Sequence, residues 1–220
     1  MIPGMTALPA LDGATFTRDP TVLADALHTA GACWIAGWPD APTTAALRAD
    51  LLRLLDAGHL RPAAVGRLAG RTLHAGIRGD ATLWLDDPVC GEVARGFLGA
   101  LDGVRTLLNR TLYLGLDEVE AHYAAYPAGT GYARHRDRFR DSDARVVTWV
   151  TYLNAEWSDG DGGAIRLYPP EDALPGTAPV DCLPIGGSVC FLSEREHEVL
   201  PALRQRLSIA AWFRRRTGLR

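Results

Sequence analysis

The sequence contains no lysine, so all 23 basic residues of this 220-residue chain are arginine. Schiff-base enzymes, pyridoxal-phosphate enzymes and Walker A nucleotide-binding proteins need a compact or titratable ammonium group, which the guanidinium of arginine does not supply. Protein kinases also depend on a lysine that holds the ATP phosphates. The absence of lysine therefore excludes all four classes.

Cysteine is sparse, and neither sign of charge dominates. The four cysteines are spaced unlike those of a zinc ribbon or a dense disulfide framework, so we expect reduced thiols. The net charge of −3 gives no electrostatic argument for nucleic acid or an anionic membrane. No apolar run approaches the roughly 18 residues that span a bilayer, and the first residues lack the pattern of a secretory signal. We therefore expect a cytoplasmic protein without a nucleic-acid or membrane partner.

The length and the 47% hydrophobic content indicate a single domain spanning residues 1–220. Residues 1–110 are expected to be largely helical, with some strands. Apolar spacing and terminal glycines predict helices at Thr21–Ala30, Thr44–Ala57 and from about Pro88 to Leu108. Strands are predicted at Cys33–Trp38 and Ala81–Leu85.

From residue 111 to residue 213 the pattern changes to short segments rich in β-branched and aromatic residues, which indicate a sandwich or barrel. The predicted strands are Thr111–Gly115, Val119–Tyr126, Tyr132–Asp137, Val146–Leu153, Ala164–Tyr168, Ser188–Leu192, His197–Leu200 and Leu207–Phe213. Pro169–Pro184 is predicted to be a long irregular connection. Several strands are apolar on both faces, as expected if helices cover one face and a pocket lies on the other.

His135 and Asp137 have the spacing of a metal site. Residues i and i+2 of a strand point to the same face, so this spacing aims an imidazole and a carboxylate at one point. His197 begins a later predicted strand and supplies a third candidate ligand. Two histidines and one carboxylate on one face form the ligand set of non-haem Fe(II) oxygenases. Taken alone, a His-x-Asp motif is more often structural or a surface feature.

Arg206 is the second candidate binding residue. It follows His197 by nine residues and shares one face of the last predicted strand with Ser208, Ala210 and Trp212. A buried arginine needs an anion, which is either an Asp or Glu of the protein or a ligand. An arginine with a serine two residues later is suited to binding the distal carboxylate of 2-oxoglutarate.

A series of ordered motifs extends these two observations over residues 75–213. The sequence resembles the Fe(II)- and 2-oxoglutarate-dependent prolyl hydroxylases, in particular the hypoxia-sensing group and its short bacterial relatives. The matching residues are Ile77-Arg78-Gly79-Asp80, Trp84-Leu85, Tyr126-Pro127, Gly129-Thr130-Gly131-Tyr132, His135, Asp137, Tyr152-Leu153-Asn154, Gly162-Gly163, Arg166, His197-Glu198-Val199, Pro201-Ala202, Arg206 and Trp212. The resemblance implies a double-stranded β-helix (jelly-roll, cupin-like), mainly β with flanking helices (α+β) that pack on one sheet.

The resemblance also implies a set of ligand-binding residues. The iron ligands would be His135, Asp137 and His197. Arg206 and Tyr152 would bind the distal carboxylate of 2-oxoglutarate, and Tyr126 would lie near this cosubstrate. Relatives often carry a threonine four residues after the arginine; here that position is Ala210, and Ser208 offers the hydroxyl instead.

A second set of residues is implied for the substrate. Asp80 is expected to form an ion pair with Arg145, and Arg78 and Trp212 are further candidates for substrate contact. Gly66–Gly79 would be a loop that closes over the peptide. His122 shares strand parity with Tyr126, which would let it face the pocket, and a core histidine is the favoured of these two interpretations.

The implied activity is that of a dioxygenase that hydroxylates a prolyl residue of a protein and releases succinate and CO2. Fe(II), 2-oxoglutarate and O2 are the implied cofactors, with ascorbate as a candidate reductant. The implied partner is a protein or peptide that contains proline, in bacteria a translation factor such as elongation factor Tu. Two alternatives remain open: a hydroxylase of a free amino acid or small peptide natural product, and a non-catalytic jelly-roll that binds metal or a partner.

Overall fold

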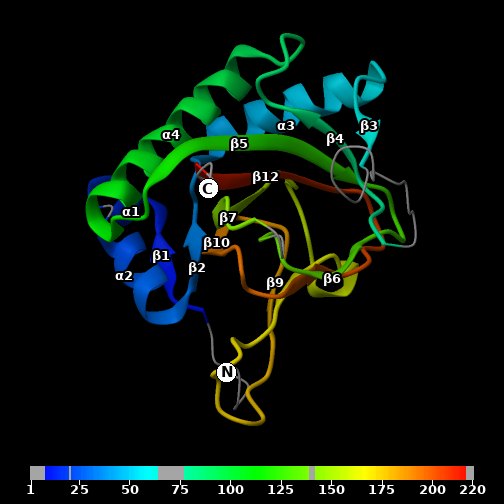
Figure 1. Ribbon diagram of the computed structural model, residues 1–220. Helices are drawn as coiled ribbons and strands as arrows, with labels where there is room; N and C mark the ends of the chain where they lie inside the picture. Colours follow the sequence, from blue (N-terminus) through cyan, green and yellow to red (C-terminus); the bar gives the residue numbers. More distant parts are fainter. Residues whose placement is uncertain (1–7, 20, 64–76, 139–141, 217–220) are drawn as a thin grey trace.

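The computed structural model describes residues 8–19, 21–63, 77–138 and 142–216, and shows a mostly β protein with helices gathered on one side (Figure 1). The helices within these ranges are α1 (Gly13–Arg18), α2 (Thr21–Ala30), α3 (Ala41–Asp56) and α4 (Glu92–Leu112). None of them is long and apolar enough to cross a lipid bilayer.

Two β-sheets form most of the remainder. The larger sheet has the strand order β1-β2-β10-β7-β12-β5-β4-β3 and consists of β1 (Ala10–Asp12), β2 (Ala32–Ala36), β3 (Arg61–Pro62), β4 (Ala81–Trp84), β5 (Leu116–Tyr126), β7 (Arg145–Tyr152), β10 (Gly187–Leu192) and β12 (Arg206–Arg215). The smaller sheet has the order β6-β11-β8-β9 and consists of β6 (Tyr132–His135), β8 (Ile165–Leu167), β9 (Val180–Cys182) and β11 (His197–Val199). The chain alternates between the two sheets, which confirms the double-stranded β-helix.

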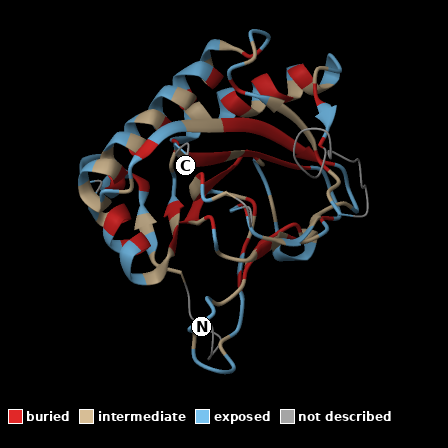
Figure 2. Ribbon diagram, viewed as in Figure 1, coloured by how far each residue is buried: buried red, intermediate tan, exposed pale blue. Residues whose placement is uncertain are grey.

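Strand β7 separates two apolar cores. Val147 and Trp149 belong to the cluster shared with the helices, whereas Val150 and Tyr152 belong to a second cluster with residues of the smaller sheet. Successive side chains of a strand point to opposite faces, so neither face of β7 meets solvent. Figure 2 shows the same burial along the middle strands of the large sheet, with the exposed helix faces on the outside.

Helix α4 covers the outer face of the large sheet beside β5. Its buried residues include Phe97, Leu101, Val104 and Leu108, which recur at three- and four-residue spacing and form one apolar stripe. The prediction that helices pack on one sheet is therefore confirmed, and the opposite face of that sheet is left to line an interior cavity.

The prediction of a strand at Thr111–Gly115 was wrong. Helix α4 continues to Leu112, and Tyr113 ends it in the left-handed conformation with φ 52. The Asn109 side chain then pairs with the backbone of Leu116, its Nδ2 donating to the Leu116 carbonyl and its Oδ1 accepting from the Leu116 amide, both at 2.7 Å. These bonds set the turn into β5. The β-branched and aromatic residues of 111–115 suggested a strand and gave no sign of this turn. The irregular connection predicted at 169–184 also contains strand β9.

Candidate active site

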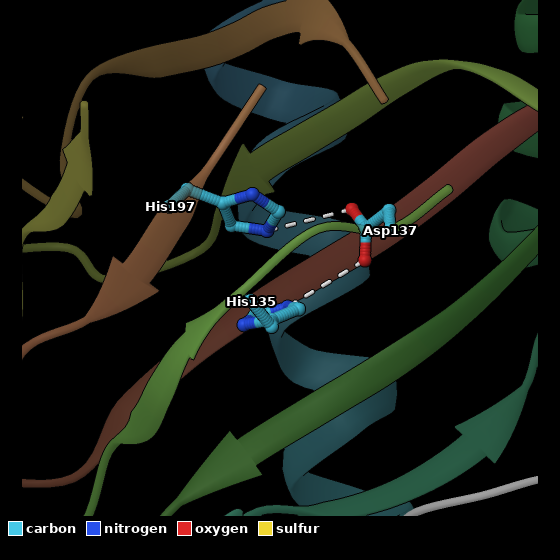
Figure 3. A group of neighbouring side chains, drawn as sticks. All are labelled: His135, Asp137 and His197. Atoms are coloured by element: carbon cyan, nitrogen blue, oxygen red, sulfur yellow. Dashed lines mark ion pairs between the residues drawn. The ribbon is translucent and has the colours of Figure 1, made fainter. Parts of the chain in front are cut away.

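Three side chains from two neighbouring segments converge between the sheets (Figure 3). His135 ends β6 and is the cross-strand partner of His197, which begins β11. The Nε2 atom of His135 lies 3.6 Å from Oδ1 of Asp137, and the Nε2 atom of His197 lies 3.5 Å from Oδ2. One candidate ligand atom from each residue lies within 4.8 Å of the other two. The structure thus brings the three predicted ligands together.

The position of Asp137 differs from the expected one. The sequence predicts that His135 and Asp137 share one strand, but β6 ends at His135 and Asp137 lies in the bend that follows. Alternation along a strand therefore does not orient the carboxylate. A hydrogen bond from another segment holds it, donated by the Thr148 hydroxyl at 2.8 Å. Thr148 was not singled out in the sequence, although a threonine on the cavity face of an otherwise apolar strand was a usable signal.

The protonation states of Asp137 and His197 suit a divalent cation. Burial alone would raise the pKa of the Asp137 carboxyl, but His197 and His135 outweigh burial and hold that pKa well below its ordinary value. Burial lowers the pKa of His197 to about 4, so its imidazole is neutral near pH 7. The Nδ1 atoms of His135 and His197 lie 2.7 and 3.0 Å from backbone carbonyls, which places the N–H there and turns each Nε2 lone pair toward Asp137. This donor set fits Fe(II).

Arg206 lies fully buried at the start of β12 with part of its charge unmatched. Its Nε donates to the Gly163 carbonyl and its Nη1 to the Ser208 hydroxyl, both at 2.9 Å. Its Nη2 has no hydrogen-bond partner in the described part of the chain, and no carboxylate there pairs with it. A buried guanidinium in this state is costly unless an anion joins it. Arg206 therefore fits the carboxylate of a bound ligand.

Two tyrosines stand beside Arg206. Its Cζ lies 5.1 Å from the ring centroid of Tyr126 and 5.3 Å from that of Tyr152. The Tyr152 hydroxyl is also buried without a partner in the described residues. Burial raises the pKa of both phenols, so both remain protonated donors at neutral pH. The structure therefore gathers the residues implied for the distal carboxylate, with two unused donors, Arg206 Nη2 and Tyr152 OH, among them.

One cavity connects the metal-ligand cluster with Arg206. His135, Asp137 and His197 line it together with Arg206, Ser208 and Ala210. An anion on Arg206 and a cation among the three ligands would therefore share one cavity. Fe(II) and 2-oxoglutarate both fit the residues that are present.

The predicted ion pair between Asp80 and Arg145 is wrong. Asp80 instead accepts two bonds from Arg78, from Nε at 2.6 Å and from Nη2 at 2.9 Å. Arg145 donates to Glu120 at 3.0 and 2.7 Å, and its Cζ lies 3.7 Å from the ring centroid of Trp212. The sheet register gives the reason: Asp80 precedes β4 beside the Tyr126 end of β5, whereas Arg145 is level with the opposite end of β5.

His122 is buried, as expected of a core histidine, and it also lies in the cavity wall, as its shared parity with Tyr126 allows. Its ring is 5.2 Å from the ring of Trp84 and 5.2 Å from that of Trp212. Its Nε2 is 3.4 Å from Nη2 of Arg78, and burial together with Arg78 lowers its pKa to about 4. Arg78, His122 and Trp212 thus line one wall of the cavity. Of the predicted closing loop Gly66–Gly79, residues 66–76 lie outside the described residues.

Comparisons with known proteins agree with this geometry. A sequence profile described as the 2OG-Fe(II) oxygenase superfamily matches residues 121–214. Human prolyl hydroxylase EGLN3 is 30% identical over 200 residues, which cover 85% of this chain and 80% of that protein. Human Egl nine homolog 1 is 33% identical over 146 residues, or 62% of this chain, and the match spans only 33% of that longer protein.

Two solved structures are similar over most of the chain. A prolyl-4-hydroxylase from Pseudomonas putida superposes with a TM-score of 0.78 and 41% identity, covering 90% of this chain and 99% of that one. A prolyl hydroxylase from Trichoplax adhaerens, in complex with a hypoxia-inducible factor peptide, gives a TM-score of 0.77 and 29% identity, covering 91% of each chain. The chain therefore belongs to the 2OG-Fe(II) oxygenase superfamily and, within it, to the prolyl hydroxylases.

Proposed function

We propose that this protein is an Fe(II)- and 2-oxoglutarate-dependent dioxygenase that hydroxylates a prolyl residue within a protein, with release of succinate and CO2. One observation carries the proposal. The cluster of His135, Asp137 and His197 shares a cavity with a buried arginine, Arg206, that has an unpaired Nη2. A metal-binding set and an anion-binding group in one cavity are what a 2-oxoglutarate oxygenase requires.

The side chains have separate tasks in this proposal. His135, Asp137 and His197 hold Fe(II), which with 2-oxoglutarate and O2 supplies the oxidation of a C–H bond. Arg206 and Tyr152 bind the distal carboxylate, each through a donor that has no other partner among the described residues.

Ser208 and Tyr126 support that contact. Ser208 accepts from Nη1 and so fixes the plane of the Arg206 guanidinium. Tyr126 packs its ring against the same guanidinium and helps exclude water from the cosubstrate.

The charges beside this cavity wall favour a peptide over a free amino acid. A free amino acid presents an α-carboxylate, which would need an available cation. Arg78 is bonded to Asp80, whose side chain is fully buried, and Arg145 is bonded to Glu120. Both of these described cations thus already have carboxylate partners, and a prolyl residue between two neutral amides suits this wall better. Trp84, 40% exposed beside His122, and Trp212 add apolar ring surface for such a residue.

We further propose a bacterial protein of the cytoplasm as the substrate, with elongation factor Tu as the first candidate. The support is the 41% identity with a bacterial prolyl-4-hydroxylase over 90% of this chain. A proline-containing segment of such a protein would enter past Arg78 and Trp212, which line the cavity.

The test supplies the protein with Fe(II), 2-oxoglutarate, O2 and ascorbate as reductant, and compares intact elongation factor Tu, a prolyl peptide from it and free proline. We expect succinate to form with the protein and the peptide, and mass spectrometry to find one added oxygen atom on a prolyl residue. Turnover of free proline alone would favour the free amino acid alternative. No turnover of any substrate, together with no metal binding, would contradict the proposal and favour a non-catalytic jelly-roll that binds a partner.

A further inference from the structure

A chain of two hydroxyl groups, one on β7 and one in the turn after β10, reaches the Asp137 carboxylate. The Thr148 hydroxyl donates to Oδ2 of Asp137 at 2.8 Å. A carboxylate only accepts, so the single hydroxyl proton of Thr148 is used there, and Thr148 accepts from the Ser193 hydroxyl, also at 2.8 Å. All three side chains are buried. The order of donation is therefore fixed as Ser193 to Thr148 to Asp137.

Ser193 also holds the same region through its backbone. Its carbonyl accepts from the Arg138 amide at 2.9 Å, one residue after Asp137, and its amide donates to the Val146 carbonyl at 3.0 Å. Ser193 lies just after β10, in the turn that leads to His197. It therefore ties the bend that carries Asp137 to the segment that carries His197, and ties both to β7.

We propose that Thr148 and Ser193 are positioning residues for the metal-binding carboxylate. Thr148 engages Oδ2 and leaves Oδ1, on the His135 side, as the oxygen that binds a divalent cation. A carboxylate that coordinates through one oxygen leaves room for other ligands on the cation, as this family of reactions requires. The inference rests on the metal centre of the proposed function and is independent of the substrate.

Asp137 needs these two positioning residues because it lies outside any strand. The backbone pairing of β6 ends at His135, so the sheet does not fix the orientation of the Asp137 carboxylate. Hydrogen bonds to a metal-binding carboxylate restrict its rotation and maintain its charge. Removing the Thr148 hydroxyl while keeping the shape of the side chain would leave the carboxylate free to turn inside a rigid cavity.

The chain provides a matched control on the same two strands. Thr151 on β7 and Ser188 on β10 are also buried and are joined by a hydroxyl–hydroxyl bond of 2.8 Å. They point to the helix side, where Trp149 Nε1 donates to Thr151 at 3.0 Å and the Ser188 hydroxyl donates to the Trp38 carbonyl at 2.8 Å. Thr151→Val and Ser188→Ala therefore remove equivalent groups that do not reach Asp137.

The test titrates Mn²⁺ into the metal-free protein by calorimetry, so that no turnover is needed. We expect Thr148→Val to raise the Kd for Mn²⁺ by roughly 10- to 100-fold, the usual effect of removing a hydrogen bond to a metal ligand. Thr148→Ser should restore binding, and Ser193→Ala should weaken it less. The double variant should bind no worse than Thr148→Val, because Ser193 acts through Thr148. Thr151→Val and Ser188→Ala should bind Mn²⁺ as the wild type does.

Unchanged affinity in Thr148→Val and Ser193→Ala, with normal binding by the wild type, would overturn the inference and leave the proposed function intact. An equal loss in Thr151→Val would also overturn it, since the effect would then come from the general loss of a buried hydroxyl. Absence of Mn²⁺ binding by the wild type would overturn the metal centre and this inference together. If Thr148→Val does not fold, the Mn²⁺ affinity of Ser193→Ala, compared with that of Ser188→Ala, decides the test.

Discussion

His135 and His197 are direct cross-strand partners in the small sheet, with their ring centroids 4.2 Å apart. Residues far apart in the sequence thus become neighbours through one strand pairing between β6 and β11. A shift of one residue in this register would turn one imidazole to the opposite face of the sheet. The spacing between the two metal-ligand histidines is therefore a property of the strand register.

Arg206→Lys should raise the KM for 2-oxoglutarate by about tenfold or more, with a smaller effect on kcat. Lysine keeps the charge but loses the planar guanidinium, which contacts Gly163, Ser208 and the bound carboxylate from different nitrogen atoms. Steady-state kinetics with varied 2-oxoglutarate measures the change. Arg166→Lys is the control, because Arg166 forms an exposed bidentate pair with Asp181. An equal KM for the Arg206→Lys variant and the wild type would show that Arg206 does not bind the cosubstrate.

Tyr152→Phe should weaken 2-oxoglutarate binding without destabilising the ligand-free protein. The Tyr152 hydroxyl is buried with no partner in the described residues, so its removal takes away an unsatisfied donor. The ring still stacks on Trp34 at 5.7 Å. Thermal unfolding with and without 2-oxoglutarate measures both effects. A large loss of stability without ligand would mean that the hydroxyl has a structural partner instead.

Asp80→Asn should lower the free energy of unfolding by about 3 kcal/mol, because removing one partner of a buried ion pair leaves the other charge uncompensated. The Asp80 side chain is fully buried and that of Arg78 is 15% exposed. Asp181→Asn is the matched control, since its pair with Arg166 is exposed and should contribute at most about 1 kcal/mol. Denaturant unfolding compares the two variants. Similar losses in both would argue against a special role of the Arg78–Asp80 pair.

The metal-free protein should lose stability as the pH falls from about 6.5 to about 4. Burial lowers the pKa of His122 from 6.5 to about 4 in the folded state. Between these two pH values the imidazole is protonated in the unfolded chain but not in the folded protein, so a falling pH favours unfolding. The charged groups that face His122 are Arg78, Asp80 and Arg145. His197 has a lowered pKa of about 4 as well.

His122→Gln should remove the His122 part of this pH dependence, on the order of 3 kcal/mol between pH 7 and pH 4. Denaturant unfolding over that range in the presence of a chelator measures it. His28→Gln is the control, because His28 is an exposed residue of helix α2. Parallel pH profiles for His122→Gln and the wild type would contradict a neutral, buried His122.

Local periodicity in the sequence predicted much of the fold and of the site. Alternation along one strand placed Arg206 and Ser208 on the same face, and the structure joins them by a hydrogen bond of 2.9 Å. The helix Thr21–Ala30 was also predicted at the bounds observed. These features depend on neighbours within a few residues, which a sequence pattern can report.

Two features of the site that were predicted wrongly or not at all depend on long-range contacts. The partner of Asp80 is decided by the sheet register, which places Arg145 toward the opposite end of β5. The orientation of Asp137 depends on Thr148 and Ser193, which come from other strands and turns. Strand parity could have marked Thr148 as a hydroxyl on the cavity face, but the partner of each contact leaves no periodic signal, because it follows from how distant segments pack.

The most direct measurement of the central claim is a calorimetric titration of 2-oxoglutarate into the protein with and without Mn²⁺. If the three ligands and Arg206 form one site, binding should be tight with Mn²⁺ and much weaker without it. The Asp137→Ala and Arg206→Lys variants should each weaken binding in the presence of Mn²⁺. Equal affinity with and without the metal, or no binding in either state, would contradict the account.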